Sequence, residues 1–472
     1  MKVHKELFFS LVVTILIIIV MVFLVPPKYS LRDDGFLFFL VIVTLFSSCI
    51  YLIGIYKITR SWLSFFSLFL LGYVIVNYQV ILLSICGIEP SKPSFIWINP
   101  LVVNYSTWLS SIAINSFILG SILYFINKAK NTVQVKYEKF QVNLKAYDYF
   151  LIVALGTFGL LVGKEFLSGR YDGGSNWGAG ASYVFIILRC SVILRIIYFF
   201  KLRNEKSNKR ESLYSALQHN KIFALVYLIY LGLFLQSGDR GPMIEILVVT
   251  LISYSMFYKS ISLGKLLLIG SIGIVLMTLV RLGRTSFDNV EGNILERGIN
   301  NFQNSESDSF FFTDELASSV RILYRAVDVV PSKHDYLYGT TMVFDAIAGI
   351  PFASRLLFSS IEVPVMYRSS TYFFTVMGQG NFYTYGEGSH FVGDIYINLG
   401  VYGVIFLMFL FGAFISFIFN SHRENKNFIL VIFYISICGA AIYMNRSVFF
   451  FPFQIAIYLY VLHLVFSKKI LS

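Results

Sequence analysis

Charged residues and cysteines are both scarce in this chain of 472 residues. Only 14% of the residues are Asp, Glu, Lys or Arg, which is too small a polar fraction for a soluble protein of this length. The cysteines, Cys49, Cys86, Cys190 and Cys438, lie in or beside apolar runs without paired or metal-binding spacing. The chain also lacks a P-loop, a nucleophile elbow and a Rossmann fingerprint. These absences exclude a disulfide framework, a zinc motif and the common soluble nucleotide-binding and hydrolase classes.

Apolar residues dominate the chain. Hydrophobic residues make up 57% of it, and the mean hydropathy is +0.71. Because about 20 apolar residues span the hydrocarbon core of a bilayer, the sequence predicts an all-α polytopic membrane protein with about 12 transmembrane helices. The predicted spans are residues 7–25, 36–56, 61–84, 109–127, 148–168, 182–200, 221–236, 242–258, 262–281, 392–419, 427–445 and 448–467.

Lysine and arginine residues fall in alternate loops between these runs. Cytoplasmic loops are enriched in both residues, and the basic loops are separated by even numbers of predicted helices, so we expect both termini to be cytoplasmic. The net charge of +12 comes mostly from the lysine and arginine residues of these same loops. It therefore does not indicate a nucleic-acid partner. The first run is too long for a signal-peptide core and lacks a cleavage site, so we expect it to be a retained helix.

One long loop is predicted on the opposite side of the membrane. Loops of this length are usually functional. A helix is predicted from Thr313 to Val330, with Glu315 in its first turn and an apolar stripe. Arg321 and Arg325 lie four residues apart and therefore share one face of this helix. The predicted regions are helices one to nine in residues 1–281, the large extracytoplasmic loop in 282–391, and the last three helices in 392–472.

Arginines gather on the extracytoplasmic side, against the usual bias. Arg240, Arg281, Arg284 and Arg446 fall at the outer ends of predicted helices, on the same side as the loop that contains Arg321 and Arg325. Such an excess indicates an anionic partner, and the planar guanidinium group suits phosphate oxygens. Arg281, Arg284 and Arg446 could each instead anchor a helix end among lipid headgroups.

The sharpest local motif is QSGDRGP, residues 236–242. It predicts a tight turn and a helix N-terminus beside Arg240, which together suit a phosphate group. The alternative is a hairpin in which Asp239 pairs with Arg240. Two further arginines lie inside the sixth predicted span. We expect Arg195 to extend to the cytoplasmic face, and Arg189 to face a polar cavity or a carboxylate such as Glu245.

The segment 378–403 contains the best general-base candidates in the chain. They are Glu387, His390 and Asp394, and the last two lie one helical turn apart if the helix begins near residue 389. Tyr383 and Tyr385 offer aromatic faces for sugar rings. The bland alternative is that Asp394 neutralises a loop arginine and that His390 is an ordinary interfacial residue.

A competing acidic motif is the pair Asp33 and Asp34 in the first outer loop. Two adjacent carboxylates can hold a divalent ion, but no second acidic cluster stands out in the sequence. We therefore expect no metal site and no cofactor.

Three stretches of the second half resemble the O-antigen polysaccharide polymerases, the Wzy-type repeat-unit polymerases, which are related to the O-antigen ligases. They are GDRGP at 238–242, ELASSVRILYRAVDVVP at 315–331 with YLYG at 336–339, and GEGSHFVGDIYINLGVYGVIFLMFLFG at 386–412. Their order and the helix count fit the family. Asp394 stands where the family often has a glutamate, so the carboxylate is one methylene shorter here.

The resemblance implies a membrane-embedded, GT-C-like glycosyltransferase that is inverting and metal-independent. Its substrates would be undecaprenyl-pyrophosphate-linked oligosaccharides, and its active site would face the periplasm from the bacterial cytoplasmic (inner) membrane. The outer arginines, with Arg189, Tyr383 and Tyr385, would bind the substrate, and His390, Glu387 or Asp394 would act on the acceptor hydroxyl. A chain-length regulator is a further implied partner. The alternatives are an O-antigen ligase and a lipid-linked glycan flippase, although the chain lacks the internal repeat typical of transporters.

Overall fold

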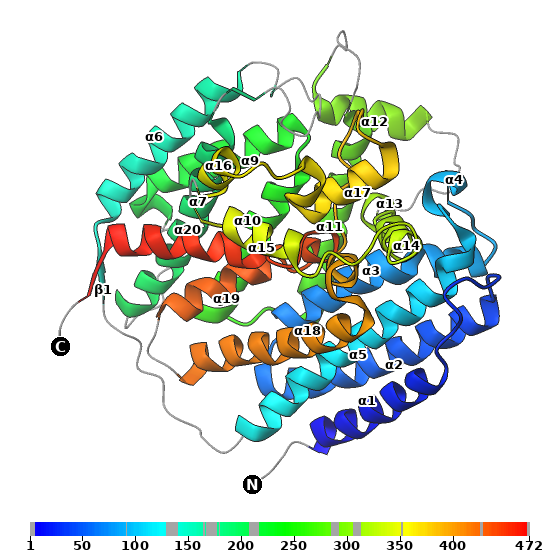
Figure 1. Cartoon of the computed structure of the whole chain (residues 1–472). Helices are drawn as coiled ribbons and strands as arrows, with labels where there is room; N and C mark the ends of the chain where they lie inside the picture. Colours follow the sequence, from blue (N-terminus) through cyan, green and yellow to red (C-terminus); the bar gives the residue numbers. More distant parts are fainter. Residues whose placement is uncertain are drawn as a thin grey trace.

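The computed structural model describes residues 5–90, 92–128, 140–163, 166, 177–178, 180–206, 217–284, 292–304, 313–350, 353–424 and 428–469. These residues are mainly helical (Figure 1). Each of the twelve predicted apolar runs coincides with a helix over most of its described residues, and residues 164–165, 167–168 and 427 of these runs lie outside the described part of the chain. Nine helices within the described residues are long and apolar enough to cross a membrane. They are α1 (Lys5–Phe23), α2 (Asp34–Thr59), α3 (Phe65–Ile85), α5 (Val103–Lys128), α6 (Leu144–Val162), α7 (Ala181–Lys206), α10 (Arg240–Phe257), α11 (Leu263–Gly283) and α18 (Phe391–Glu424).

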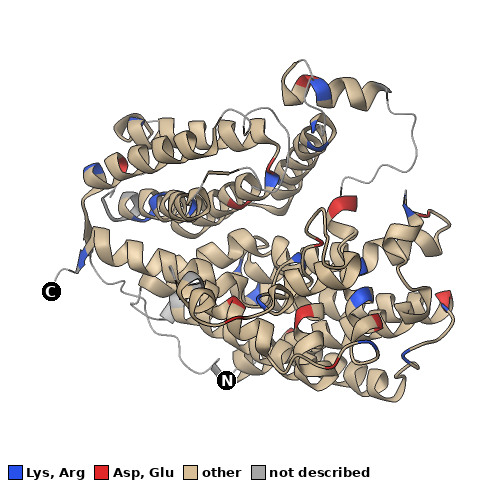
Figure 2. Cartoon of the chain, turned by 45° about the horizontal axis from the view of Figure 1, so that its top comes forward, with Lys and Arg blue, Asp and Glu red and all other residues tan. Residues whose placement is uncertain are grey.

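Three of the twelve runs form shorter apolar helices, so the count of twelve spans stays a prediction. These helices are α9 (Lys221–Ser237), α19 (Phe428–Ala440) and α20 (Phe451–Phe466). Large apolar side chains are exposed along α1, α6 and α11, among them Phe8, Leu160 and Leu267. Most turns of the long helices carry no charged residue (Figure 2). Exposed apolar faces of this kind suit contact with lipid, and the fold is that of a polytopic helical membrane protein.

The centre of one half of the molecule is the contact between α5 and α18, which run beside α1 and α2 (Figure 1). A Cβ atom at Gly120 would lie 2.0 Å from the backbone oxygen of Phe409, and one at Gly412 would lie 2.0 Å from that of Phe117. Glycine at both positions therefore lets the two backbones touch. The helix α18 also bends at Gly400, where φ is 65°, so the predicted tenth span is interrupted.

The long loop folds into short helices that pack over one end of the bundle. Its helix α14 was expected to bury one stripe, but Arg321, Tyr324 and Asp328 are also buried. The predicted helix from Thr313 to Val330 is in fact two helices, because the chain turns between Ala317 and Val320. The loop elements are α12 (Ile294–Asn304), α13 (Asp314–Ala317), α14 (Val320–Val329), α15 (Thr340–Ala348), α16 (Ala353–Ser360), η3 (Val365–Tyr367) and α17 (Ser370–Gln379).

Other short elements mark the two ends of the bundle. At one end, β1 (Phe140–Val142) pairs antiparallel with β2 (Ser467–Lys469), so the strand before α6 lies beside the strand that follows α20. At the other end are α4 (Pro93–Ile96), η1 (Pro100–Val102) and η4 (Tyr443–Arg446). Here Lys28 Nζ donates to the backbone oxygen of Val330 at 2.8 Å. The cytoplasmic assignment of the basic loops and of the termini stays a prediction, and residues 129–139, 207–216 and 425–427 of those loops lie outside the described residues.

Candidate functional site: two arginine–glutamate clusters

Three arginines from separate segments surround Glu315, and we call these four residues the Glu315 cluster. Arg240 is the first residue of α10, Arg284 follows α11, and Arg446 ends η4. Arg240 pairs with Oε2 of Glu315, Arg284 Nη1 lies 3.7 Å from the same oxygen, and Arg446 Nη1 lies 3.7 Å from Oε1. The structure thus brings together three of the four arginines predicted at helix ends.

The QSGDRGP turn sets the geometry of this cluster. Gly238 ends α9 with φ 75°, and its oxygen accepts a hydrogen bond from Arg284 Nε at 2.8 Å. A Cβ atom at this position would lie 3.1 Å from Arg284 Cγ, so glycine is required for both the turn and the contact. Asp239 caps α10 by accepting from the N–H of Gly241 at 3.3 Å. Its carboxylate therefore occupies the helix terminus where a phosphate was expected, and Arg240 pairs with Glu315 instead.

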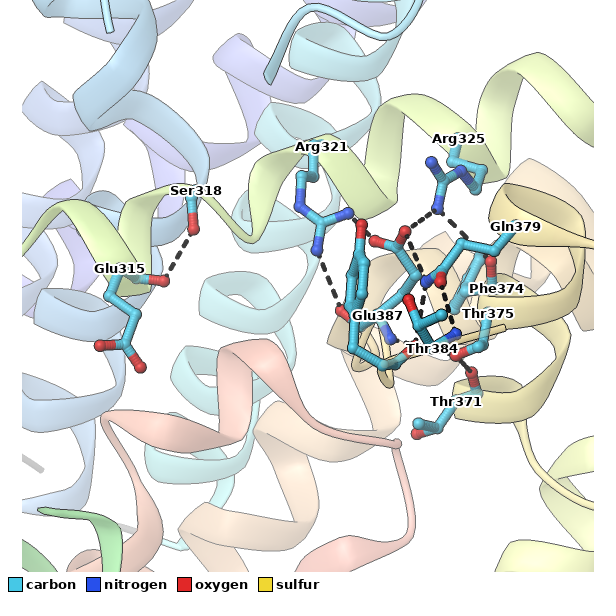
Figure 3. Close-up of polar contacts among 11 residues, drawn as sticks. Glu315, Ser318, Arg321, Arg325, Thr371, Phe374, Thr375, Gln379, Thr384 and Glu387 are labelled. Atoms are coloured by element: carbon cyan, nitrogen blue, oxygen red, sulfur yellow. Dashed lines mark hydrogen bonds and ion pairs between the residues drawn. The ribbon is translucent and has the colours of Figure 1, made fainter. Parts of the chain in front are cut away.

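A second group, which we call the Glu387 cluster, consists of Arg321, Arg325 and Glu387 (Figure 3). Arg321 pairs with Glu387 Oε2, and Arg325 Nη1 lies 3.2 Å from Oε1. The prediction that both arginines share one face of a helix is confirmed. The guanidinium of Arg321 also covers the ring of Phe95 at 4.0 Å, a favourable cation–π position.

The Glu387 cluster is closed by α17. Gln379 Nε2 donates to Glu387 Oε1 at 3.2 Å, and the N–H of Glu387 donates to Thr375 Oγ1 at 3.1 Å. A Cβ atom at Gly378 would lie 2.1 Å from Nη1 of Arg325. Gly378 therefore makes the space that the Arg325 guanidinium fills, a role that the sequence did not suggest.

The two clusters interact through charge. Burial, followed by the charge of Arg325, lowers the pKa of Arg321 to about 10, and the charge of Arg446 contributes to this shift. Burial also lowers the pKa of Arg325. For Glu315, burial acts to raise the pKa, but the combined charges of its three arginine neighbours outweigh burial and lower it. Five guanidinium groups thus face two glutamate carboxyl groups, and positive charge is in excess.

The other general-base candidates are buried and engaged in structural contacts. Burial lowers the pKa of His390 to about 3, so its ring is neutral near pH 7. Its Nδ1 accepts from the N–H of Gly393 at 3.1 Å, which places the ring proton on Nε2. Asp394 Oδ2 accepts from the N–H of Phe449 at 2.8 Å. This bond ties α18 to the turn that contains Arg446.

Asp345 in α15 joins this buried region and was not singled out from the sequence. Burial, with the charge of Asp394 as the second cause, raises its pKa to about 7. The two aspartates are 49 residues apart in sequence, and no local motif connects them. Glu315 was predicted only as a first-turn residue, although a lone carboxylate between arginine-rich segments could have marked it as an ion-pair partner.

The remaining predicted residues lie in several places. Arg189 pairs with Glu245, as predicted. Arg195 is fully buried, with its Nε 2.7 Å from Asp148 Oδ1 near the start of α6, and its extension toward the cytoplasmic face stays a prediction. A nearby carboxylate compensates its charge inside the bundle.

Arg281 lies in the last turn of α11 and is not among the described ion-pair partners of Glu315 or Glu387. Tyr383 and Tyr385 are exposed beside α17, and Tyr385 interacts electrostatically with both Arg321 and Arg325. Tyr383 thus remains accessible for stacking, while Tyr385 lies next to the Glu387 cluster.

Acidic residues in the first outer loop have local partners. Asp33 caps α2 by accepting from the N–H of Phe36 at 3.0 Å, and Asp34 lies 2.6 Å from Arg32. Within the described residues, no group of three or more His, Cys, Asp or Glu side chains is arranged to hold a metal ion.

The fold and site define a polytopic helical membrane protein with arginine–glutamate clusters at one end of its bundle. A family model described as "Domain of unknown function (DUF8712)" matches residues 211–428. This segment contains both glutamates and four of the five clustered arginines, with Arg446 beyond it. No curated protein and no solved structure matches the chain.

Proposed function

We propose that the protein polymerises lipid-linked oligosaccharide repeat units at the extracytoplasmic face of the bacterial cytoplasmic membrane. The observation that carries this proposal is the convergence of five arginines at one end of a membrane-spanning bundle. Pyrophosphates of lipid carriers lie at that depth, and guanidinium groups bind their oxygens through paired hydrogen bonds.

In the proposed reaction, a hydroxyl of the acceptor repeat unit attacks the anomeric carbon of the donor glycan. The bond from that carbon to the pyrophosphate oxygen breaks, a glycosidic bond forms with inversion, and the hydroxyl proton passes to water at the extracytoplasmic face. Undecaprenyl pyrophosphate leaves as an anion. Fixed positive charge stabilises the developing negative charge on this leaving group, so the chemistry does not require a metal ion.

The arginines supply most of the catalytic effect in this proposal. The carboxylate of Glu387 is paired with two guanidinium groups, and Nδ1 of His390 accepts from a backbone N–H. The carboxylate of Asp394 accepts from a backbone N–H in the turn after η4. These contacts favour positioning roles for the three residues. The reactivity of the acceptor hydroxyl then depends chiefly on how it is oriented toward the anomeric carbon. The exposed ring of Tyr383 offers a surface on which the glycan can stack.

A deletion strain and a purified assay test the proposal. A polymerase deletion leaves polysaccharide of single repeat length, a ligase deletion leaves the lipid core without glycan, and a flippase deletion blocks export of the repeat unit. Purified protein in nanodiscs should extend lipid-linked repeat units in the presence of EDTA. Absence of extension with a complete substrate, or its loss on chelation alone, would contradict the proposed metal-independent polymerase.

A further inference from the structure

The two glutamates hold their arginines in different surroundings. We propose that the Glu315 cluster is an exchangeable anion subsite, in which the Glu315 carboxylate occupies the place of a pyrophosphate and withdraws when that ligand binds. The Glu387 cluster is by contrast a fixed support for α14. The nature of the ligand rests on the proposed function, whereas the exchange rests on the contacts of the cluster.

Exposure separates the clusters most clearly. The side chains of Glu315 and Arg446 are 38% and 34% exposed, whereas those of Arg240 and Arg284, which lie deeper, are 12% and 18% exposed. In the other cluster, the side chain of Glu387 is 2% exposed, and those of Arg321 and Arg325 are 8% and 11% exposed. A ligand that arrives from water or from the lipid headgroup region can therefore reach Glu315 without unfolding the loop, but cannot reach Glu387.

The two glutamates also differ in how they are anchored to the rest of the protein. The main chain of Glu387 is bound on both sides, because its N–H donates to Thr375 and its oxygen accepts from Arg321. Its carboxylate also accepts from Gln379. Glu315 lies on the short helix α13, where its backbone oxygen accepts from Ser318 Oγ at 2.9 Å, and its carboxylate contacts are ion pairs with arginines. The Glu315 side chain can therefore rotate away when another anion takes over those ion pairs.

The charge balance favours such an exchange. Three guanidinium groups in the Glu315 cluster share one carboxylate, whereas a pyrophosphate linkage carries negative charge on each of its phosphate groups. Arg240 Nε is buried without a hydrogen-bond partner among the described residues. A buried donor that lacks a partner gains free energy when a phosphate oxygen accepts its hydrogen bond. Arg284 and Arg446 can bind the same ligand by the ion-pairing groups they now present to Glu315.

Titration of the purified full-length protein with inorganic pyrophosphate tests the exchange. Glu315→Gln removes the competing charge and keeps the side-chain size. We expect it to tighten pyrophosphate binding roughly tenfold, the factor that corresponds to about 1.4 kcal/mol. Arg446→Gln removes one ligand at the exposed rim and should weaken binding by a similar factor. Asp34→Asn is the matched control, since it removes an exposed carboxylate that is also paired with an arginine, and it should leave the affinity unchanged.

Each outcome has a distinct meaning. Unchanged or weaker binding by Glu315→Gln would overturn the exchange, as would equal tightening by Glu387→Gln. If Glu315→Gln fails to fold, the Arg446→Gln variant still tests the proposal, because an unchanged pyrophosphate affinity in that variant would overturn it. Nanodiscs of phosphatidylglycerol and of phosphatidylcholine separate the two anion sources. If phosphatidylglycerol abolishes pyrophosphate binding, the cluster is a general headgroup site and the pyrophosphate assignment is wrong. If the affinities respond as expected but the deletion strain makes normal polysaccharide, the proposed function fails and the anion subsite remains.

Discussion

The Glu315 and Glu387 clusters are built from the same chemical groups but differ in what surrounds them. Arginines from three distant segments meet Glu315 at the rim of the bundle, and its side chain is 38% exposed. The arginines of the Glu387 cluster come from one helix, and the side chain of Glu387 is 2% exposed. Exposed ion pairs are weak and replaceable, whereas a buried charge that loses its partner is strongly destabilising. The difference indicates a binding role for the first cluster and a structural role for the second.

The largest expected effect comes from Glu387→Ala. Because this substitution leaves Arg321 and Arg325 buried without their carboxylate, it should destabilise the folded protein by roughly 3–5 kcal/mol. Thermal unfolding in detergent measures the loss, and Glu315→Ala is the matched variant, with an expected cost below about 1 kcal/mol. Equal losses in both variants would remove the distinction between the clusters.

The second effect is on catalysis. Arg240→Ala should reduce polymerisation of lipid-linked repeat units by roughly 10²–10³-fold, the range seen when one preorganised donor to a developing anion is removed. Arg32→Ala serves as the control, because Arg32 also pairs with a carboxylate, that of Asp34 at the start of α2. Comparable activity of the two variants would argue against a pyrophosphate contact by Arg240.

A smaller effect is expected from Gly378→Ala. The added methyl group must displace the Arg325 guanidinium, whose Nη1 lies 2.1 Å from the ideal Cβ position. Overpacking of this kind typically destabilises by about 1–3 kcal/mol. The double variant Gly378→Ala with Arg325→Ala should recover part of the loss in melting temperature. A purely additive double variant would show that Gly378 does not make room for Arg325.

The smallest effect is the pH dependence of the Glu315 ion pairs. The pKa of Glu315 is lowered from the ordinary value of 4.5 in the folded protein, so its contribution to stability is complete above that value and is lost as the pH falls through the lowered pKa. The free energy of unfolding of the wild type should exceed that of Glu315→Gln by at most about 1 kcal/mol near neutral pH. Melting curves of both proteins between neutral pH and pH 3 should converge in acid, and a difference that grows in acid would contradict this assignment.

Much of the fold followed from apolar periodicity and length. All twelve predicted runs coincide with helices over most of their described residues, and the contact between Arg189 and Glu245 was foreseen because a charge inside a span requires a partner. The helix from Thr313 to Val330 was predicted as one element, yet it is broken between α13 and α14. Its packing explains the error, since Arg321 is buried there although local periodicity predicts an exposed polar face.

The site was predicted as a set of arginines but not as two groups. Charge bias by itself identified Arg240, Arg284, Arg321, Arg325 and Arg446. It did not identify the carboxylates that hold them, because Glu315 lies 75 residues from Arg240 and Glu387 lies 66 residues from Arg321. Such pairings depend on how the loop packs on the bundle, and sequence spacing carries no information about them.

The sequence by itself determined that the chain is a helical membrane protein, and it predicted a group of arginines on the side opposite to the basic loops, because hydrophobicity, helix length and charge bias are local properties. Only the tertiary structure decided which arginines meet, which glutamate joins them, and how far each pair is removed from water. Those outcomes depend on contacts between distant segments, such as the glycine-mediated contact of α5 with α18 and the bond from Phe449 to Asp394. Burial then gives Glu315 and Glu387 different strengths of attachment, although their side chains are chemically identical.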